Sequence, residues 1–227
     1  MQRKIILAAV LLLSCLIGLA QFEKPDFDKI EKEIRDKNSP YYYPELLKRY
    51  TANDTTLSVT EYRYLYYGYS FQEKYSPYGS PAVADALSKA IAANETDKAI
   101  ELEKAALAEY PFNIRNLYML RKLLDKKGDT SQADIYDKKM ISVAKAILST
   151  GDGLSDSTAM YVISVSHEYD IIFLLGYKSS GQALFSGKYG SMDRMSLQKN
   201  DDDVQYLYFN VDRLFASMER LFDKKKN

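Results

Sequence analysis

The stretch SPAVADALSKAIAANETDKAIELEKAALAEYPFNIRNLYMLRKLLDKKGDTSQADIYDKKMISVAKAI, residues 80–147, decides the fold of this chain. Its apolar residues recur at the spacing of one helix face, and turn residues separate the segments that carry this pattern. Five pairs of positions stand at one fixed offset of 34 residues: Val83 and Leu117, Ala86 and Leu120, Ala90 and Leu124, Ala99 and Ala133, Leu107 and Ile141. The pattern therefore predicts four helices that form two copies of a helix–turn–helix unit.

Proline, glycine and capping residues mark where these four helices begin and end. Ser80 and Pro81 predict the first start, because proline is tolerated at the first helical position. Pro111 ends the second helix, Asn113 caps the third, and Gly128 ends the third in the left-handed conformation. Short loops between neighbouring helices follow from these positions.

The spacing Ala99-x6-Ala106-Leu107-x3-Pro111 resembles the second half of a tetratricopeptide repeat, where small residues let paired helices pack closely. Glu103 departs from that family because it occupies an aromatic position, and neither predicted unit begins with the large aromatic residue usual there. A plain antiparallel helical bundle is the alternative, since such bundles also use short loops. The resemblance concerns architecture and implies no ligand.

The rest of the chain divides into more helices upstream and a mixed segment downstream. Helices are expected over residues 25–37 and 44–50 and after the capping box of Ser58 and Glu61, and later over 167–175 and 211–222; strands are expected over 159–165, 177–185, 192–197 and 204–209. The expected fold class is α+β. An N-terminal antiparallel helical, tetratricopeptide-like layer over residues 21–150 precedes a small antiparallel β-sheet with two helices over residues 151–227.

Residues 1–20 have the pattern of a secretory signal peptide. Arg3 and Lys4 precede an apolar run, and Gly18-Leu19-Ala20 offers small residues for cleavage before Gln21. We therefore expect a periplasmic or secreted protein of a Gram-negative bacterium, with no transmembrane helix in the mature chain. Cys15 leaves an alternative open, in which it is lipidated and anchors the chain, although the apolar run continues past it.

Composition excludes several classes of function. The chain has 31 Lys+Arg and 31 Asp+Glu, so it lacks the basic excess of a nucleic-acid-binding protein. Cys15 and His167 are its only cysteine and histidine, which leaves no common zinc framework and no Cys–His pair in a chain cleaved after Ala20. We expect His167 to be a surface residue near a helix start. The sequence indicates no catalytic residue, metal site or cofactor. Whether the protein is an enzyme stays open, and a non-enzymatic protein is favoured.

Tyrosine is the unusual feature, since 11 of the 20 tyrosines lie between residues 41 and 78. Helical spacing favours a core role for those after Ser58, whereas Pro40 and Pro44 are expected to hold Tyr41-Tyr42-Tyr43 extended, with at least one ring exposed or at a groove edge. Exposed aromatic rings grouped with arginine often carry binding energy. The candidate binding residues are Tyr41, Tyr42, Tyr43, Arg49, Asn53 and Asp54.

A family resemblance rests on several short motifs spread over the chain. They are Ser39-Pro40-Tyr41-Tyr42-Tyr43-Pro44, Arg49-Tyr50, Asn53-Asp54-Thr55-Thr56-Leu57, residues 61–69 (EYRYLYYGY), Glu168-Tyr169-Asp170, Gln182 and Tyr208-Phe209-Asn210. These motifs resemble an uncharacterised family of secreted Gram-negative envelope proteins, classed as a domain of unknown function. The resemblance implies export and a chain of about this length, and it implies no activity.

Two functions remain as hypotheses. In the first, a non-enzymatic envelope protein uses a groove of its helical repeat layer to bind a peptide or an envelope protein partner, because repeat layers form concave surfaces. In the second, a glycan-binding module or a hydrolase acts on envelope polysaccharide, with tyrosines as stacking platforms. An open tyrosine-lined cleft with two close carboxylates would favour the second hypothesis, and a groove lined by Tyr, Asn and Arg without such a pair would favour the first.

Overall fold

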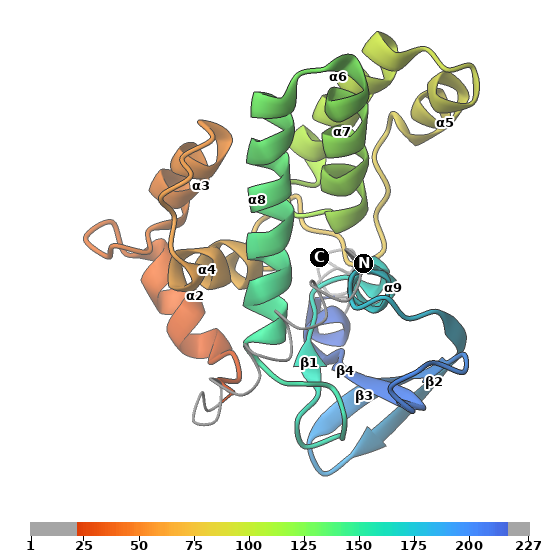
Figure 1. The fold of residues 1–227 in the computed structure, drawn as a ribbon. Helices are drawn as coiled ribbons and strands as arrows, with labels where there is room; N and C mark the ends of the chain where they lie inside the picture. The colour runs from red at the N-terminus through yellow and green to blue at the C-terminus, as the bar shows by residue number, and fades with distance from the viewer. Residues whose placement is uncertain (1–21, 218–227) are drawn as a thin grey trace, which may run out of the picture.

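Among the described residues, those before residue 149 form helices and connecting turns, and the strands follow them (Figure 1). The computed structural model describes residues 22–217. The helices are α2 (Phe27–Arg35), α3 (Tyr43–Thr51), α4 (Val59–Tyr69), α5 (Ala84–Ala92), α6 (Thr96–Glu109), α7 (Ile114–Lys127), α8 (Thr130–Leu148) and α9 (Val165–Leu174). The strands are β1 (Met160–Tyr161), β2 (Ser179–Gly187), β3 (Gly190–Leu197) and β4 (Tyr206–Asn210), and residues 212–217 are again helical. The fold class is α+β, as the sequence predicts.

Local capping chemistry sets most of the helix ends. Ser58 and Glu61 form the predicted capping box at the start of α4, and the Asn113 side chain accepts a hydrogen bond from the Asn116 backbone N–H at the start of α7. Gly128 ends α7 with a φ of 86°, in the left-handed region that glycine enters without steric cost. Residues with this local chemistry are recognisable in the sequence alone.

The predicted start of α5 at Ser80 is wrong, because the helix begins at Ala84 and no side chain caps it. The Ala82 N–H donates to the Glu109 carboxylate at 2.9 Å, and residues 81–84 form a turn closed by the bond from Ala84 N to Pro81 O. These bonds hold residues 81–84 as a turn against the end of α6.

Helices α5 to α8 pack successively, each against the next, and α8 also packs against α4 near the middle of the molecule (Figure 1). The four alanines expected at close helix contacts, Ala99, Ala106, Ala133 and Ala144, are all buried. Among the five pairs at the 34-residue offset, only Ala90 with Leu124 and Ala99 with Ala133 are buried at both members. The assignment of these helices to tetratricopeptide units stays a prediction.

The sheet has the strand order β1-β4-β3-β2, and it is antiparallel except where β1 pairs with β4 in parallel. The sheet is thus mostly antiparallel, as predicted, and the short β1–β4 pair is the parallel exception. The expected strand over 159–165 is also shortened to Met160–Tyr161, because helix α9 already begins at Val165. Val162 and Ile163 are 1% exposed, so their apolar character serves the core rather than a strand.

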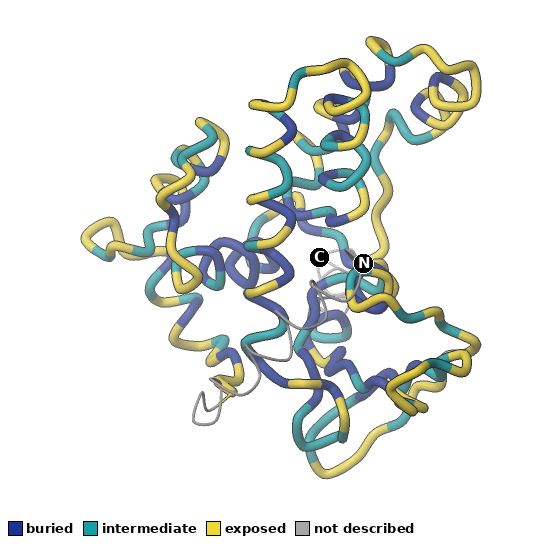
Figure 2. The backbone as a smooth tube through the Cα atoms, in the orientation of Figure 1, coloured by how far each residue is buried: buried dark blue, intermediate teal, exposed yellow. Residues whose placement is uncertain are grey.

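One hydrophobic core joins the helical layer to the sheet. It contains Leu65 and Tyr66 of α4, Ile147 of α8, and Met195 and Phe209 of the sheet. Figure 2 shows the buried residues gathered where α4, α8 and the strands meet. Between residues 22 and 217, no helix combines the length and the apolar character needed to cross a membrane.

The alanine contacts give a first prediction. Replacing Ala99, which is 0% exposed and packs against Leu87 and Ala90, with Leu should overpack the seam between α5 and α6. We expect the free energy of unfolding to fall by about 1–3 kcal/mol, measured by urea denaturation. Ala105→Leu, at an exposed position of the same helix, is the control. An unchanged midpoint for Ala99→Leu would show that the seam has room for three more carbon atoms.

Candidate functional site

An open groove of about 510 Å³ lies between α3, the end of α4, α6 and α8. This volume is in the range of sites that bind ligands or peptide segments. Its aromatic lining consists of Tyr43, Tyr50, Tyr69 and Tyr136, and its polar lining includes Asn53 and Lys139. Leu117 of α7 also lines it, so five helices contribute to one concave surface.

The structure brings two of the six predicted binding residues to this groove. Tyr43 and Asn53 line the groove. Arg49 instead forms ion pairs with Asp54 (2.8 Å) and Glu61, so its charge is satisfied inside the protein. Hydrogen bonds from Thr56, and then from Arg49, lower the pKa of Asp54 to about 2. Arg49 and Asp54 thus fix the loop that carries Asn53 rather than facing a ligand.

The three consecutive tyrosines are not extended, which corrects the sequence prediction. Residues 37–41 form turns, and Tyr43 is the first residue of α3. Pro44 is compatible with the first turn of a helix, where its missing N–H costs no hydrogen bond, so it starts α3 instead of enforcing an extended chain. Tyr41 stacks on Tyr64 with ring centroids 3.8 Å apart, Tyr42 is half-buried, and Tyr43 is 5% exposed.

Lys139 of α8 is the functional candidate that the sequence analysis missed. Its side chain is buried at the groove, and its Nζ donates to the Asn53 Oδ1 at 2.6 Å. The Nζ also lies 4.3 Å from the ring centroid of Tyr50 and 5.3 Å from that of Tyr136. Burial lowers the pKa of Lys139 to about 8. The sequence could have indicated it, because Lys139 stands between Tyr136 and Met140 on the face of the helix predicted to be buried.

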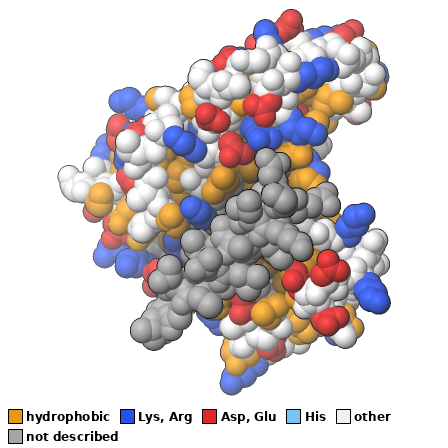
Figure 3. Space-filling view, in the orientation of Figure 1, with side chains coloured by type: hydrophobic (Ala, Val, Ile, Leu, Met, Phe, Trp, Pro, Cys, Tyr) orange, Lys and Arg blue, Asp and Glu red, His pale blue; other side chains and the backbone are white. Residues whose placement is uncertain are grey.

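No acidic side chain among residues 22–217 forms an ion pair with Lys139. The groove has two acidic residues, Glu73 and Glu109, and both are exposed to solvent. On the face shown in Figure 3, basic and acidic side chains are interspersed, with no extended patch of one sign. The buried ammonium is therefore a local feature within a surface of mixed charge.

Helix α9 buries three ionisable residues, His167, Glu168 and Asp170. His167 is 4% exposed, which corrects the expectation of a surface histidine. Its Nδ1 lies 2.7 Å from the Tyr66 hydroxyl, and burial lowers its pKa to about 4, so the ring is neutral at pH 7. The Tyr66 hydroxyl accepts a hydrogen bond from the Ile163 N–H and donates its own proton to the His167 Nδ1.

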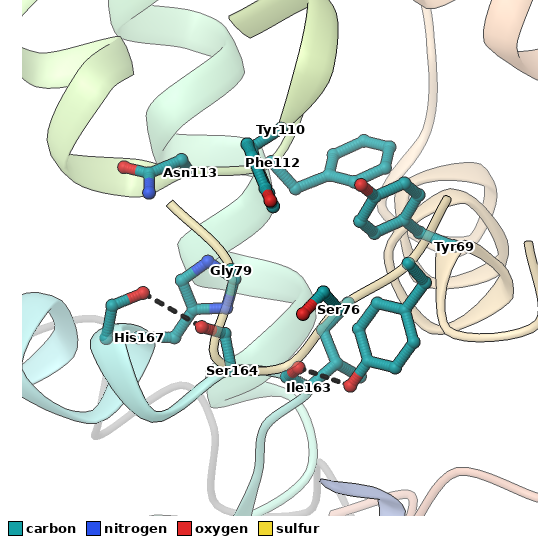
Figure 4. Close-up of a pocket in the computed structure, with 11 residues that line it drawn as sticks. Tyr69, Ser76, Gly79, Tyr110, Phe112, Asn113, Ile163, Ser164 and His167 are labelled. Carbon is teal, nitrogen blue, oxygen red and sulfur yellow. Dashed lines mark hydrogen bonds between the residues drawn. The ribbon is translucent and has the colours of Figure 1, made fainter. Parts of the chain in front are cut away.

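A small cavity adjoins His167 and is lined also by Tyr69, Ser76, Tyr110 and Phe112 (Figure 4). Its volume is about 30 Å³. A space of this size holds about two water molecules. It therefore serves no larger ligand, and we assign His167 a structural role.

Glu168 and Asp193 form a close pair of buried carboxyl groups between α9 and β3. The Gln182 Nε2 donates to Asp193 at 2.7 Å and lies 3.4 Å from Glu168, while the Tyr169 hydroxyl donates to the Gln182 Oε1 at 2.7 Å. Burial, followed by repulsion from Asp193, raises the pKa of Glu168 to about 9. Glu168 is therefore protonated at neutral pH, and Gln182 and Tyr169 cover the pair.

The raised pKa of Glu168 makes stability depend on pH. Below its usual pKa of 4.5, Glu168 is protonated in both the folded and the unfolded chain, and its contribution to stability is fully present. Between 4.5 and about 9 the unfolded chain releases this proton and the folded chain keeps it, so stability falls as pH rises. Glu168→Gln keeps the shape and removes the titration.

We expect urea denaturation at pH 6 and pH 9 to show a smaller loss of stability for Glu168→Gln than for the wild type. Glu73→Gln, at an exposed position, is the control and should follow the wild type. Equal losses in all three proteins would contradict a proton held on Glu168.

The comparisons with known proteins identify a family and no activity. No curated protein and no solved structure matches the chain. A family model described as a domain of unknown function, DUF4919, matches residues 28–220, which includes both the groove and the buried carboxyl pair. The chain therefore belongs to the DUF4919 family.

Proposed function

We propose that this protein is a non-enzymatic binding protein whose groove takes up an extended peptide segment of a partner protein. The observation that carries the proposal is the groove of about 510 Å³ with its four tyrosines and the buried Lys139. Tyrosine combines a large ring with a hydroxyl and loses little rotamer entropy on binding, which suits peptide recognition.

The walls of the groove support this proposal because they are held in place before a ligand arrives. The Tyr50 hydroxyl donates to the Pro111 carbonyl at 2.6 Å, and the Tyr69 hydroxyl donates to the Glu109 carbonyl at 3.1 Å. These bonds connect α3 and α4 to the end of α6 across the groove. A preformed groove lowers the entropic cost of binding.

A glycan-binding module or a hydrolase of envelope polysaccharide is the second candidate, because tyrosine rings also stack on sugars. A hydrolase that uses two carboxyl groups needs them at an accessible cleft. The close pair here, Glu168 and Asp193, is buried, whereas the acidic residues that line the groove, Glu73 and Glu109, are exposed. This separation of the close carboxyl pair from the groove favours peptide binding over hydrolysis.

Filling the groove tests the proposal. Ala108 lines the groove and is exposed, whereas Ala105 is exposed on the same helix outside the groove lining. We expect Ala108→Trp to weaken binding of peptides selected from a random display library by about tenfold or more, because the indole occupies the groove. Ala105→Trp should bind as the wild type does.

Fluorescence anisotropy with labelled peptides measures both variants, and a glycan array probed with the same proteins tests the second candidate. Selected peptides that bind Ala108→Trp unchanged would place the binding surface elsewhere. Glycan binding that Ala108→Trp abolishes, without any peptide selected, would favour the second candidate.

We also propose that the protein is exported to the envelope of a Gram-negative bacterium, on the signal-peptide pattern of residues 1–20. These residues and Cys15 lie outside the described part of the structure. Mass spectrometry of the mature N-terminus should give a chain that begins at Gln21. An acylated Cys15 would instead show a lipid-anchored protein.

A further inference from the structure

We infer that the groove recognises an acidic peptide, and that an Asp or Glu side-chain carboxylate of this peptide binds between the Lys139 Nζ and the Asn53 Nδ2. This inference rests on the proposed function and specifies its ligand. It is carried by the position of one buried cation and by the orientation of one amide beside it.

Lys139 is a buried cation without a protein counter-ion. Its side chain is 7% exposed, and no ion pair within residues 22–217 includes it. Its contacts are the side-chain oxygen Oδ1 of Asn53 and the ring faces of Tyr50 and Tyr136, all of which are neutral groups. Removing an ammonium from water without an opposite charge is costly, so an anion that enters the groove gains a strong interaction.

Asn53 supplies a second donor for that anion. The ammonium of Lys139 can only donate, so the Asn53 Oδ1 must be the atom that faces it, and this fixes the orientation of the amide. The Asn53 Nδ2 has no hydrogen-bond partner among the described residues. An ammonium and an amide N–H₂ side by side match the two oxygens of one carboxylate.

The loop around Asn53 holds the amide in place. Asn53 has a φ of 62°, in the left-handed region that asparagine tolerates better than most residues. Its backbone N–H donates to the Tyr50 carbonyl at 3.1 Å, and the next N–H, of Asp54, donates to the Arg49 carbonyl at 3.0 Å. The Arg49–Asp54 ion pair closes the same loop. Arg49 and Asp54 are thus positioning residues for Asn53.

The charges around the groove favour a peptide with isolated acidic residues over an acidic polysaccharide. The groove lining also has Lys74 and Lys104, which are exposed like Glu73 and Glu109, whereas Lys139 is buried. A polyuronate has a negative charge on every ring, so such a chain lying in the groove would meet the two glutamates as well as the lysines. A peptide can present one carboxylate to Lys139 and neutral residues to the glutamates. At the buried position, one ammonium beside a neutral amide also suits a carboxylate better than a phosphate dianion, which is usually bound by several cations or by arginine.

The test uses an array of capped 12-residue peptides of random sequence, each made in an Asp/Glu form and in the matching Asn/Gln form. We expect wild-type protein to bind the acidic forms of its preferred peptides about tenfold to a hundredfold more tightly than the amide forms. Lys139→Met should abolish this preference. It should fold at least as stably as the wild type, since it replaces a buried charge with an apolar side chain.

Two further variants make the result specific. Asn53→Asp keeps the shape of the loop but gives Lys139 an internal counter-ion, so it should also abolish the preference for acidic peptides. Lys145→Met removes an exposed lysine from the same helix and should leave the preference unchanged.

The possible failures are distinguishable. Suppose that peptides bind and that Ala108→Trp blocks them. If the preference for acidic peptides is then absent, or if it persists in Lys139→Met, the proposed function stands and the acidic-peptide inference is wrong. If no peptide binds, the proposed function fails and this inference fails with it. Binding of polygalacturonate that requires Lys139 would overturn the acidic peptide in favour of an acidic glycan.

Discussion

The structure depends on the need of buried tyrosine hydroxyls for hydrogen-bond partners. Helix α4 places Tyr66 and Tyr67 at 0% exposure, where water cannot satisfy them. The Tyr66 hydroxyl bonds to His167 and to the Ile163 N–H, and the Tyr67 hydroxyl donates to the Tyr161 carbonyl at 3.0 Å. Each bond joins the helical layer to the segment around β1 and α9. The rings contribute apolar burial, and the hydroxyls decide which backbone groups lie against them.

The same rule shapes the groove. Tyr50 and Tyr69 bury their rings beside Phe112 and donate to carbonyls at the end of α6 and just after it, which sets the distance between the groove walls. The packing of α8 against α4 then brings Lys139 to the floor. The groove is thus a consequence of how the buried tyrosine hydroxyls find their hydrogen-bond partners.

Burial acts on three ionisable groups with different results. Glu168 keeps its proton because Asp193 and the surrounding core disfavour a second negative charge, and Glu103, buried in α6, has its pKa raised to about 7 by the same desolvation. Lys139 is the basic counterpart, with a pKa lowered to about 8. Glu168 lies under Gln182 and Tyr169, whereas Lys139 opens onto the groove. Both groups are desolvated, but a ligand can approach only Lys139. We therefore treat Glu168 as structural and Lys139 as a candidate binding group.

The sequence by itself determined the features that depend on local chemistry. The capping box at Ser58, the cap at Asn113 and the left-handed Gly128 follow from side chains within a few residues of each helix end, and helical periodicity identified most of the helices. Arg49, Asn53 and Asp54 were named from the sequence as candidate binding residues, whereas their roles, an ion pair of Arg49 with Asp54 and a bond from Lys139 to Asn53, appear only in the structure. Only the tertiary structure decided the features that depend on residues distant in the chain.

Helix α5 starts at Ala84 rather than at Ser80, and the Ala82 N–H before it bonds to the distant Glu109 carboxylate. Strand β1 pairs in parallel with β4, from which α9 and the β2–β3 hairpin separate it along the chain. Lys139 becomes a candidate binding residue only when α8 meets Tyr50 of α3 and Asn53, and the pairing of Glu168 with Asp193 requires α9 to lie beside β3. The physical reason is the same in each case: a charge or a hydrogen-bond donor acquires its role from the partner that folding brings to it, and sequence spacing does not encode that partner.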